Sequence, residues 1–289
     1  MRSISSATVP FILTLLLSLP ISPAGGQESI LVLARNGSAE EMRRAVEAGA
    51  SVRQRDVFDW TPLMLAAKWN ADPGVHRALI EGGAEVNSRN AEGWTPLLAA
   101  ARWNDNVDVL RFLVEAGADP DATSEEGWTP LHWSSAGGSV AGVQILIDAG
   151  APVNRSDGNG WTPLMLAGLN RNAAVADALL EAGADVDHRD SFGRTALMRA
   201  AQNPNPAVAG AMIDAGSSVT AQDALGRTPL FWAARYNKNP EVINLLIAAG
   251  SDLEHRDNSG ATFEQTLREN DELMALAEEL QTSARRQRY

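Results

Sequence analysis

Apolar residues recur along this chain in groups spaced i, i+3 and i+4, with polar residues between them. This spacing places three side chains on one face of an α-helix, so each group predicts a short amphipathic helix. The groups are Val75, Ala78 and Leu79; Val109, Phe112 and Leu113; Val143, Leu146 and Ile147; Val175, Ala178 and Leu179; Val208, Ala211 and Met212; and Val242, Leu245 and Leu246. Their regular return indicates a chain built from copies of one structural unit.

A second predicted helix precedes each of these. Its opening segment is W-T-P-L or a close variant, which starts at Trp60, Trp94, Trp128, Trp161, Arg194 and Arg227, with spacings of 34, 34, 33, 33 and 33 residues. The Thr suits an N-cap, and the Pro that usually follows suits the first helical position. In the first copy Leu63, Ala66 and Ala67 form a narrow apolar face, whose small alanines allow a neighbouring helix to approach closely.

The connections between these helices repeat as well. Loops of the pattern Asn-x-Asn or Asn-x-Asp separate the two helices of most units, and their last residue is the expected N-cap of the second helix. Second helices are expected to end at left-handed glycines, and further glycines of positive φ are expected in the turns that follow. The helix-ending glycines are Gly83, Gly117, Gly150, Gly183, Gly216 and Gly250, and the turn glycines are Gly93, Gly127, Gly160, Gly193, Gly226 and Gly260.

The 33-residue period, the T-P-L-x-x-A-A core and the A-G-A helix end resemble the ankyrin-repeat family. The resemblance implies an all-α fold, a solenoid of stacked helix-turn-helix units with β-hairpin-like connecting loops. Three departures are local: Asp59 replaces a turn glycine, Ala196 replaces the proline, and the Asn-x-Asn or Asn-x-Asp loop replaces the Gly-His that is usual between the helices. We predict a signal peptide at 1–24, an N-terminal linker and capping unit at 25–59, six repeats over 60–260 (60–93, 94–127, 128–160, 161–193, 194–226 and 227–260), a C-terminal capping unit at 261–281 and a basic tail at 282–289.

The N-terminal segment indicates export. An apolar run over about residues 9–21 follows one Arg and precedes the small residue Ala24, the pattern of a cleavable secretory signal. The run is short and contains Pro10 and Pro20, which disfavours an uncleaved membrane anchor. We therefore expect a periplasmic or secreted protein, with no stable membrane insertion after cleavage.

Charge and composition exclude several kinds of partner and site. A formal net charge of -12 argues against nucleic acid and against an anionic membrane surface. The sequence has no Cys, so it offers neither disulfides nor a thiol nucleophile. His188 and His255 occupy equivalent positions two repeats apart, too far to share a metal, and we interpret His132 and His76, the latter on a polar helix face, as structural. The sequence therefore predicts no catalytic residue, no metal site and no cofactor, and scattered hairpin carboxylates are interpreted as solvated.

The resemblance also implies where a partner would bind. In ankyrin proteins the groove is formed by hairpin tips and the exposed side of the first helices. The residue before the Thr and the two after the Ala-Ala pair would face it. Those positions hold Trp60, Trp94, Trp128, Trp161, Arg194 and Arg227, and then Lys68, Trp69, Arg102, Trp103, Arg235 and Tyr236. Because Trp, Tyr and Arg are frequent interface hot spots, we predict that this row binds a protein of unknown identity with an acidic surface.

These residues also have a structural interpretation. The six that precede Thr would, on that view, only shield each hairpin against the next unit. Trp69, Trp103 and Tyr236 favour binding, because each accompanies the extra residue of a 34-residue unit, whereas Trp133 and Trp232 replace a normally buried Leu and are assigned to the core. Three functions stay open: a non-catalytic protein-binding scaffold, a glycan-binding protein whose tryptophans stack on sugar rings, and, least favoured, a hydrolase.

Overall fold

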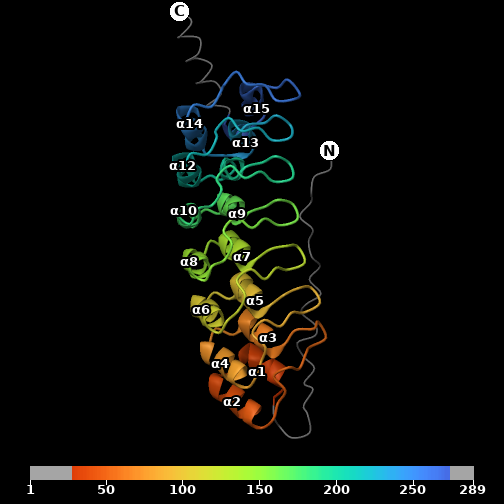
Figure 1. The fold of residues 1–289 in the computed structure, drawn as a ribbon. Coiled ribbons are helices and arrows are strands. Elements are labelled where there is room, and N and C mark those ends of the chain that lie inside the picture. The colour runs from red at the N-terminus through yellow and green to blue at the C-terminus, as the bar shows by residue number, and fades with distance from the viewer. Residues whose placement is uncertain (1–27, 274–289) are drawn as a thin grey trace, which may run out of the picture.

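The structure, a computed structural model, describes residues 28–273 and consists of helix pairs stacked in one elongated column (Figure 1). The predicted all-α solenoid is confirmed. The signal peptide, the basic tail and the outer parts of both capping units lie outside the described residues. Within 28–273 no helix is long and apolar enough to span a membrane.

The helices form two rows, with a row of loops beside the inner one (Figure 1). The inner row holds α1 (Ile30–Asn36), α3 (Pro62–Trp69), α5 (Pro96–Trp103), α7 (Pro130–Gly137), α9 (Pro163–Leu169), α11 (Ala196–Ala200), α13 (Pro229–Tyr236) and α15 (Phe263–Arg268). The outer row holds α2 (Ala39–Glu47), α4 (Pro73–Glu81), α6 (Val107–Glu115), α8 (Val140–Asp148), α10 (Ala173–Glu181), α12 (Pro206–Asp214) and α14 (Pro240–Ala248), and the 3-10 helix η1 (Asp271–Leu273) follows α15. Inner helices pack on inner helices and outer on outer, so each unit contacts its neighbours in both rows.

The inner helices begin at the predicted caps. The hydroxyls of Thr61, Thr95, Thr129, Thr162 and Thr195 each accept a hydrogen bond from the backbone N–H three residues later. Thr228 has the same extended backbone, but its buried hydroxyl has no partner among the described residues, so the predicted hydroxyl cap is wrong there. Asn172 is the N-cap of α10 as predicted, but its side chain forms no cap bond, and its amide nitrogen donates to Gly138 O.

A continuous apolar core runs through the stack between the two rows. Leu63, Ala66 and Ala67 are fully buried, and their counterparts in the later units are buried likewise, except Ala101, which is partly buried. The small alanines let α3 pack closely against α5 and α1, as the sequence predicts. The core is therefore made of one layer per unit and is extended by each added unit.

The loops form the predicted turns, but their two arms form almost no β-bridges. The helix-ending and turn glycines all have positive φ, and Asp59, with φ 65°, is the one non-glycine residue in 28–273 that does so. An Asp tolerates this left-handed conformation better than most residues. Among the described residues the only β-pairing is an isolated bridge between Arg256 and Thr262, so the connections are hairpin-like turns without strands.

Candidate binding face

The residues predicted to bind a partner lie along the inner helices and the loops beside them, but they differ in exposure. Trp69 and Tyr236 are 57% and 47% exposed, whereas Trp60 and Trp94 are only 8% and 4% exposed. Arg102 and Arg235 are exposed, and Lys68, Trp103, Trp128, Trp161, Arg194 and Arg227 are half-buried. The expected ribbon of accessible indoles is thus wrong for Trp60 and Trp94, which pack a hairpin against the following unit.

Five indoles make one continuous group in the first three repeats. This N-terminal aromatic cluster consists of Trp60, Trp94, Trp103, Trp128 and Trp133. Trp60 stacks on Trp94 with ring centroids 6.3 Å apart, and Trp94 lies 4.5 Å from Trp103 and 5.7 Å from Trp133. Trp128 and Trp133 are 4.3 Å apart. Contacts of this kind add to the burial of apolar area, so the cluster ties three hairpins together.

Two cations lie against this cluster. Lys68 Nζ is 4.8 Å from the Trp60 ring centroid and 4.1 Å from that of Trp103. The Arg102 guanidinium lies 4.6 Å from Trp103 and, on the next unit, 4.0 Å from Trp133. Burial, reinforced by the positive charge of Arg102, lowers the pKa of Lys68, and burial also lowers the pKa of Arg102. The cations stay in place through cation–π attraction.

The C-terminal half holds its cations differently. Asp190 has a fully buried carboxylate, which accepts from Arg194 Nε at 2.7 Å and from Arg199 at 3.0 Å. Arg199 also lies 4.0 Å from the Trp161 ring. Burial alone would raise the pKa of Asp190, but donation from the backbone and side chain of Arg194 outweighs it, so that pKa lies below its ordinary value. This hairpin carboxylate is therefore an internal counter-ion, which corrects its interpretation as solvated charge.

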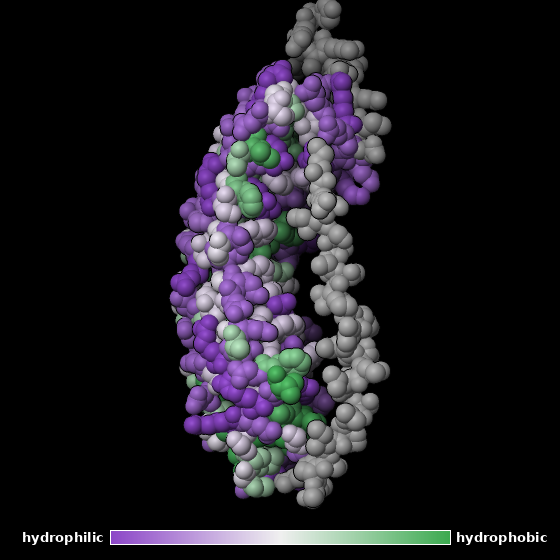
Figure 2. All heavy atoms as spheres, turned by 90° about the vertical axis from the view of Figure 1, so that its right-hand side faces the viewer, coloured by the Kyte–Doolittle hydropathy of each residue, from purple (hydrophilic) through white to green (hydrophobic). Residues whose placement is uncertain are grey.

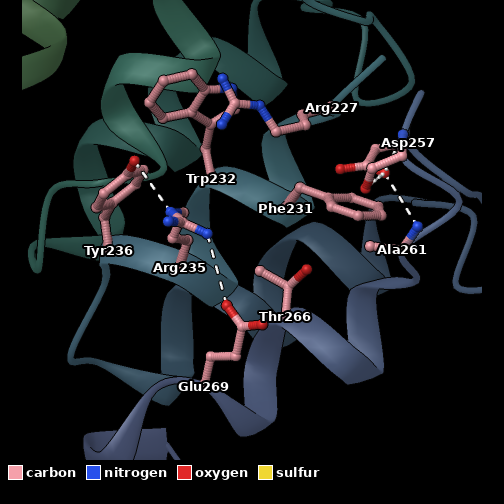
Figure 3. A pocket seen from close by; sticks show the side chains of 10 residues that line it. Arg227, Phe231, Trp232, Arg235, Tyr236, Asp257, Ala261, Thr266 and Glu269 are labelled. Carbon is pink, nitrogen blue, oxygen red and sulfur yellow. Dashed lines mark hydrogen bonds and ion pairs between the residues drawn. The ribbon is translucent and has the colours of Figure 1, made fainter. Parts of the chain in front are cut away.

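Asp223 repeats this arrangement one unit later. Its Oδ2 accepts from Arg227 Nε at 3.1 Å and from the indole nitrogen of Trp232, also at 3.1 Å. The Arg227 guanidinium lies over the Trp232 ring, 4.7 Å from its centroid, as Figure 3 shows. Trp232 is buried, which confirms its assignment to the core, whereas Trp133 is only partly buried.

A shallow cavity of about 160 Å³ lies between α13 and the C-terminal unit (Figure 3). Its walls include Trp232, Tyr236 and Thr266. At its rim Arg235 donates to the Tyr236 hydroxyl at 3.2 Å and pairs with Glu269 at 3.6 Å. The cavity is small, and both arginines that line it, Arg227 and Arg235, are already paired with carboxylates, so it offers a partner space for one side chain.

The hairpin residue five positions before each capping Thr opens a D-x-x-G-like turn in most units, but the sequence assigned it no role. These hairpin acceptors are Asp56, Asn90, Ser124, Asp157, Asp190, Asp223 and Asp257. In all except Ser124, Oδ1 accepts from the backbone N–H groups two and four residues later and so fixes the turn. The signal was present as a residue type recurring in register with the capping Thr. The contacts of the second carboxylate oxygen, Oδ2, with cations and indoles of the binding face were not predictable from spacing.

The first Asn of each loop was also missed. Its amide nitrogen donates to backbone oxygens of the preceding unit, as Asn237 does to Ala201 O and Asn203 O, both at 2.8 Å. The same role belongs to Asn70, Asn104, Asn170, Asn203 and Asn270. Gly138 stands in this position in the third repeat. We call this series the asparagine ladder. It joins successive units along the inner row.

The histidines predicted to be structural are buried. His132 Nε2 donates to Trp161 O at 3.1 Å, and its Nδ1 accepts from the Thr129 backbone N–H at 3.2 Å, so it links two units as expected. His76 is also fully buried, with Nδ1 3.0 Å from Asp72 O, and so does not lie on a polar face as predicted. Burial lowers the pKa of both residues. Within residues 28–273 no group of three His, Asp or Glu side chains is arranged to hold a metal ion.

Comparison with known proteins agrees with this geometry. A family model described as ankyrin repeats in three copies matches residues 30–124, 108–190 and 182–257. The crystal structure of the human ASB11 ankyrin repeat domain is similar, with a TM-score of 0.70 and 24% identity, over 78% of this chain and 99% of that one. At this identity the likeness shows the fold alone. No curated protein sequence matches significantly. Since the family model covers nearly all of the described helix pairs, the chain belongs to the ankyrin-repeat family.

Proposed function

We propose that this chain is a non-catalytic scaffold or adaptor that binds a partner protein through its inner helices and hairpin loops. Ankyrin repeats typically mediate protein–protein interactions, which supports the class of function. The finer part of the proposal, the location of the face and the acidic character of the partner, rests on the side chains of this chain.

One observation carries the location. Trp69 ends α3 with 57% of its surface exposed, and Tyr236 ends α13 with 47% exposed. Large aromatic side chains at these positions expose apolar area that a partner would cover. Figure 2 shows separate apolar patches on the hairpin side of the stack. The turn residues Val57 and Phe58 are 92% and 66% exposed. The face therefore offers several anchor points along the stack.

The test compares two triple variants in affinity capture from extracytoplasmic extract. One carries Trp69→Ala, Trp103→Ala and Tyr236→Ala on the inner face. The control carries exposed outer-row substitutions, Arg111→Ala, Gln144→Ala and Asp177→Ala. We expect the first to lose partners that the wild type and the control retain, with all three chains showing the same helical circular dichroism. Equal recovery by both triples would contradict the proposed face.

Glycan binding is the alternative. It requires ring faces open to a sugar, yet Trp60 and Trp94 are buried and Trp103 is partly covered by Lys68 and Arg102. Trp69 is then the most accessible indole among the predicted binding residues, and a single open indole supports stacking on sugars less well than a row. A glycan array that gives no signal, beside a discrete protein partner, would remove this alternative.

We further propose that the chain is exported and cleaved after Ala24, and this part rests on the sequence pattern of residues 1–24. Expression of the full chain, followed by fractionation and N-terminal sequencing, tests it. A product that starts at Gly25 outside the cytoplasm is expected. An intact N-terminus in the cytoplasmic fraction would contradict export.

A further inference from the structure

The binding face has two parts, which differ in whether the hairpin acceptor has a second carboxylate oxygen, Oδ2. In the C-terminal half, Asp190 Oδ2 forms ion pairs with both Arg194 and Arg199, and Asp223 Oδ2 forms one with Arg227. In the third-to-fourth repeat connection, Asp157 Oδ2 accepts from the Trp128 indole nitrogen at 2.9 Å. Arg194, Arg199, Arg227 and the Trp128 indole therefore each have an acceptor inside the molecule.

The hairpins that end the first and second repeats lack this second oxygen. Asn90 presents an amide nitrogen in its place, and Ser124 is too short to reach and bonds Glu126 instead, at 2.6 Å. The consequence is visible in two buried donors, Asn90 Nδ2 and Trp133 Nε1, which have no hydrogen-bond partner within the described chain. Trp232, at the position equivalent to Trp133, has its partner in Asp223.

Lys68 and Arg102 lie on this part of the face, against the Trp103 ring. Neither forms an ion pair with a residue in 28–273, although Glu92 and Asp56 act on Lys68, and Glu126 on Arg102, from a distance. Arg102 is exposed and Lys68 is half-buried, so both remain accessible from the groove. A half-desolvated cation without a counter-ion is costly, and a bound carboxylate would offset that cost.

We propose that Lys68 and Arg102, held on the Trp103 ring, are the site where this chain receives a carboxylate from an acidic segment of its partner protein. The inference rests on the proposed function and names the partner's chemistry. The carboxylate would serve as the counter-ion for Lys68 and Arg102, as Asp190 and Asp223 do for the arginines of the later units. The net charge of -12 makes such a site the exception on an acidic molecule, so it would also set the register of an acidic partner along the groove.

The direct test uses the full mature chain and two capped peptides, hexaglutamate and hexaglutamine, followed by tryptophan fluorescence and by the indole N–H resonances. We expect a saturable change with hexaglutamate that weakens with added salt, and none with hexaglutamine. Equal responses to both peptides, or no saturable change up to roughly 10 mM hexaglutamate, would overturn the proposal.

Charge-matched variants locate the site. Lys68→Gln with Arg102→Gln should weaken hexaglutamate binding about tenfold. The control, Arg43→Gln with Arg111→Gln on the outer helices, removes the same charge from cations already paired with Glu40 and Asp108, and should change affinity less than twofold, within the range of screened surface pairs. Equal losses in both variants would mean nonspecific attraction and would overturn the site.

A third variant keeps both cations. Asn90→Asp with Ser124→Asp supplies the hairpin carboxylates that the later units carry, and should weaken hexaglutamate binding by internal competition. Unchanged affinity would count against the proposal. Failure of this inference is distinguishable from failure of the proposed function. If the aromatic triple variant loses its partner while Lys68→Gln with Arg102→Gln retains it, the groove binds protein and only the carboxylate site is refuted.

Discussion

The indole nitrogen of Trp232 donates a hydrogen bond to Asp223 Oδ2 over 3.1 Å. Three units earlier Trp133 lacks this bond, because Ser124 stands where Asp223 stands in the later unit. We expect Ser124→Asp to supply it and to increase the free energy of unfolding by about 1 kcal/mol, the usual net value of a hydrogen bond. Glu126 is exposed and can turn away from the new charge.

The measurement is urea denaturation of the wild type, Ser124→Asp and Ser124→Asn. The asparagine variant supplies the same turn-fixing oxygen as the aspartate variant but places a donor against the indole, so it should not gain the bond to Trp133. If Ser124→Asp is no more stable than Ser124→Asn, the Trp133 indole does not gain a stabilising hydrogen bond from the new carboxylate.

The asparagine ladder gives the second prediction. Asn237 is 1% exposed, and its amide donates to two carbonyl oxygens while Oδ1 accepts from Asn239 N at 2.8 Å. Asn237→Ala leaves buried backbone groups without partners, each of which costs about 1–3 kcal/mol, so we expect a loss of roughly 3 kcal/mol. Asn159→Ala, at an exposed turn, should cost less than about 0.5 kcal/mol. Thermal and urea unfolding of the two variants checks the contrast. Similar losses of unfolding free energy in both variants would show that the asparagine ladder does not stabilise the stack.

The sequence predicted the units because their determinants are local. Thr61, Pro62 and Leu63 specify a helix start by themselves, and copies in register specify the stack. The asparagine ladder was out of reach, since the partners of Asn237 lie 34 and 36 residues back and are backbone oxygens that no residue type marks. The exposure predicted for Trp60 and Trp94 was wrong for a similar reason. Whether Trp60 lies open or stacked depends on Trp94 in the next unit, which only the assembled stack decides.

His132 predicts how stability depends on pH. Burial lowers its pKa, outweighing the opposite effects of its bond to Trp161 O and of Asp157, so the folded state favours the neutral ring. Its stabilising contribution is therefore complete above the unfolded pKa of about 6.5 and decreases as the pH falls from there toward the folded value. Protonation would also turn Nδ1, the acceptor of the Thr129 N–H, into a donor.

The comparison variant is His132→Gln, which preserves a capping box of the kind Thr262 and Gln265 form in this chain. Between pH 7.5 and 5, the wild type should lose more unfolding free energy than the variant. His76, whose pKa burial also lowers, is present in both and cancels in the difference. Parallel pH curves would exclude His132 as a source of the dependence.

The buried group of Asp190, Arg194 and Arg199 predicts an asymmetry between its acidic and basic members. Arg199→Met leaves Asp190 with Arg194 and two backbone N–H donors, so we expect a cost of about 1–2 kcal/mol. Asp190→Ala removes the acceptor that fixes the turn and leaves a buried guanidinium uncompensated, which should cost about 3–5 kcal/mol. Because the stranded cation causes much of that cost, removing Arg199 as well should restore part of the lost stability. A double-mutant cycle in urea, at pH 7, measures this coupling. Additive costs would show that Asp190 stabilises the hairpin alone and that Arg199 is held by Trp161 without its counter-ion.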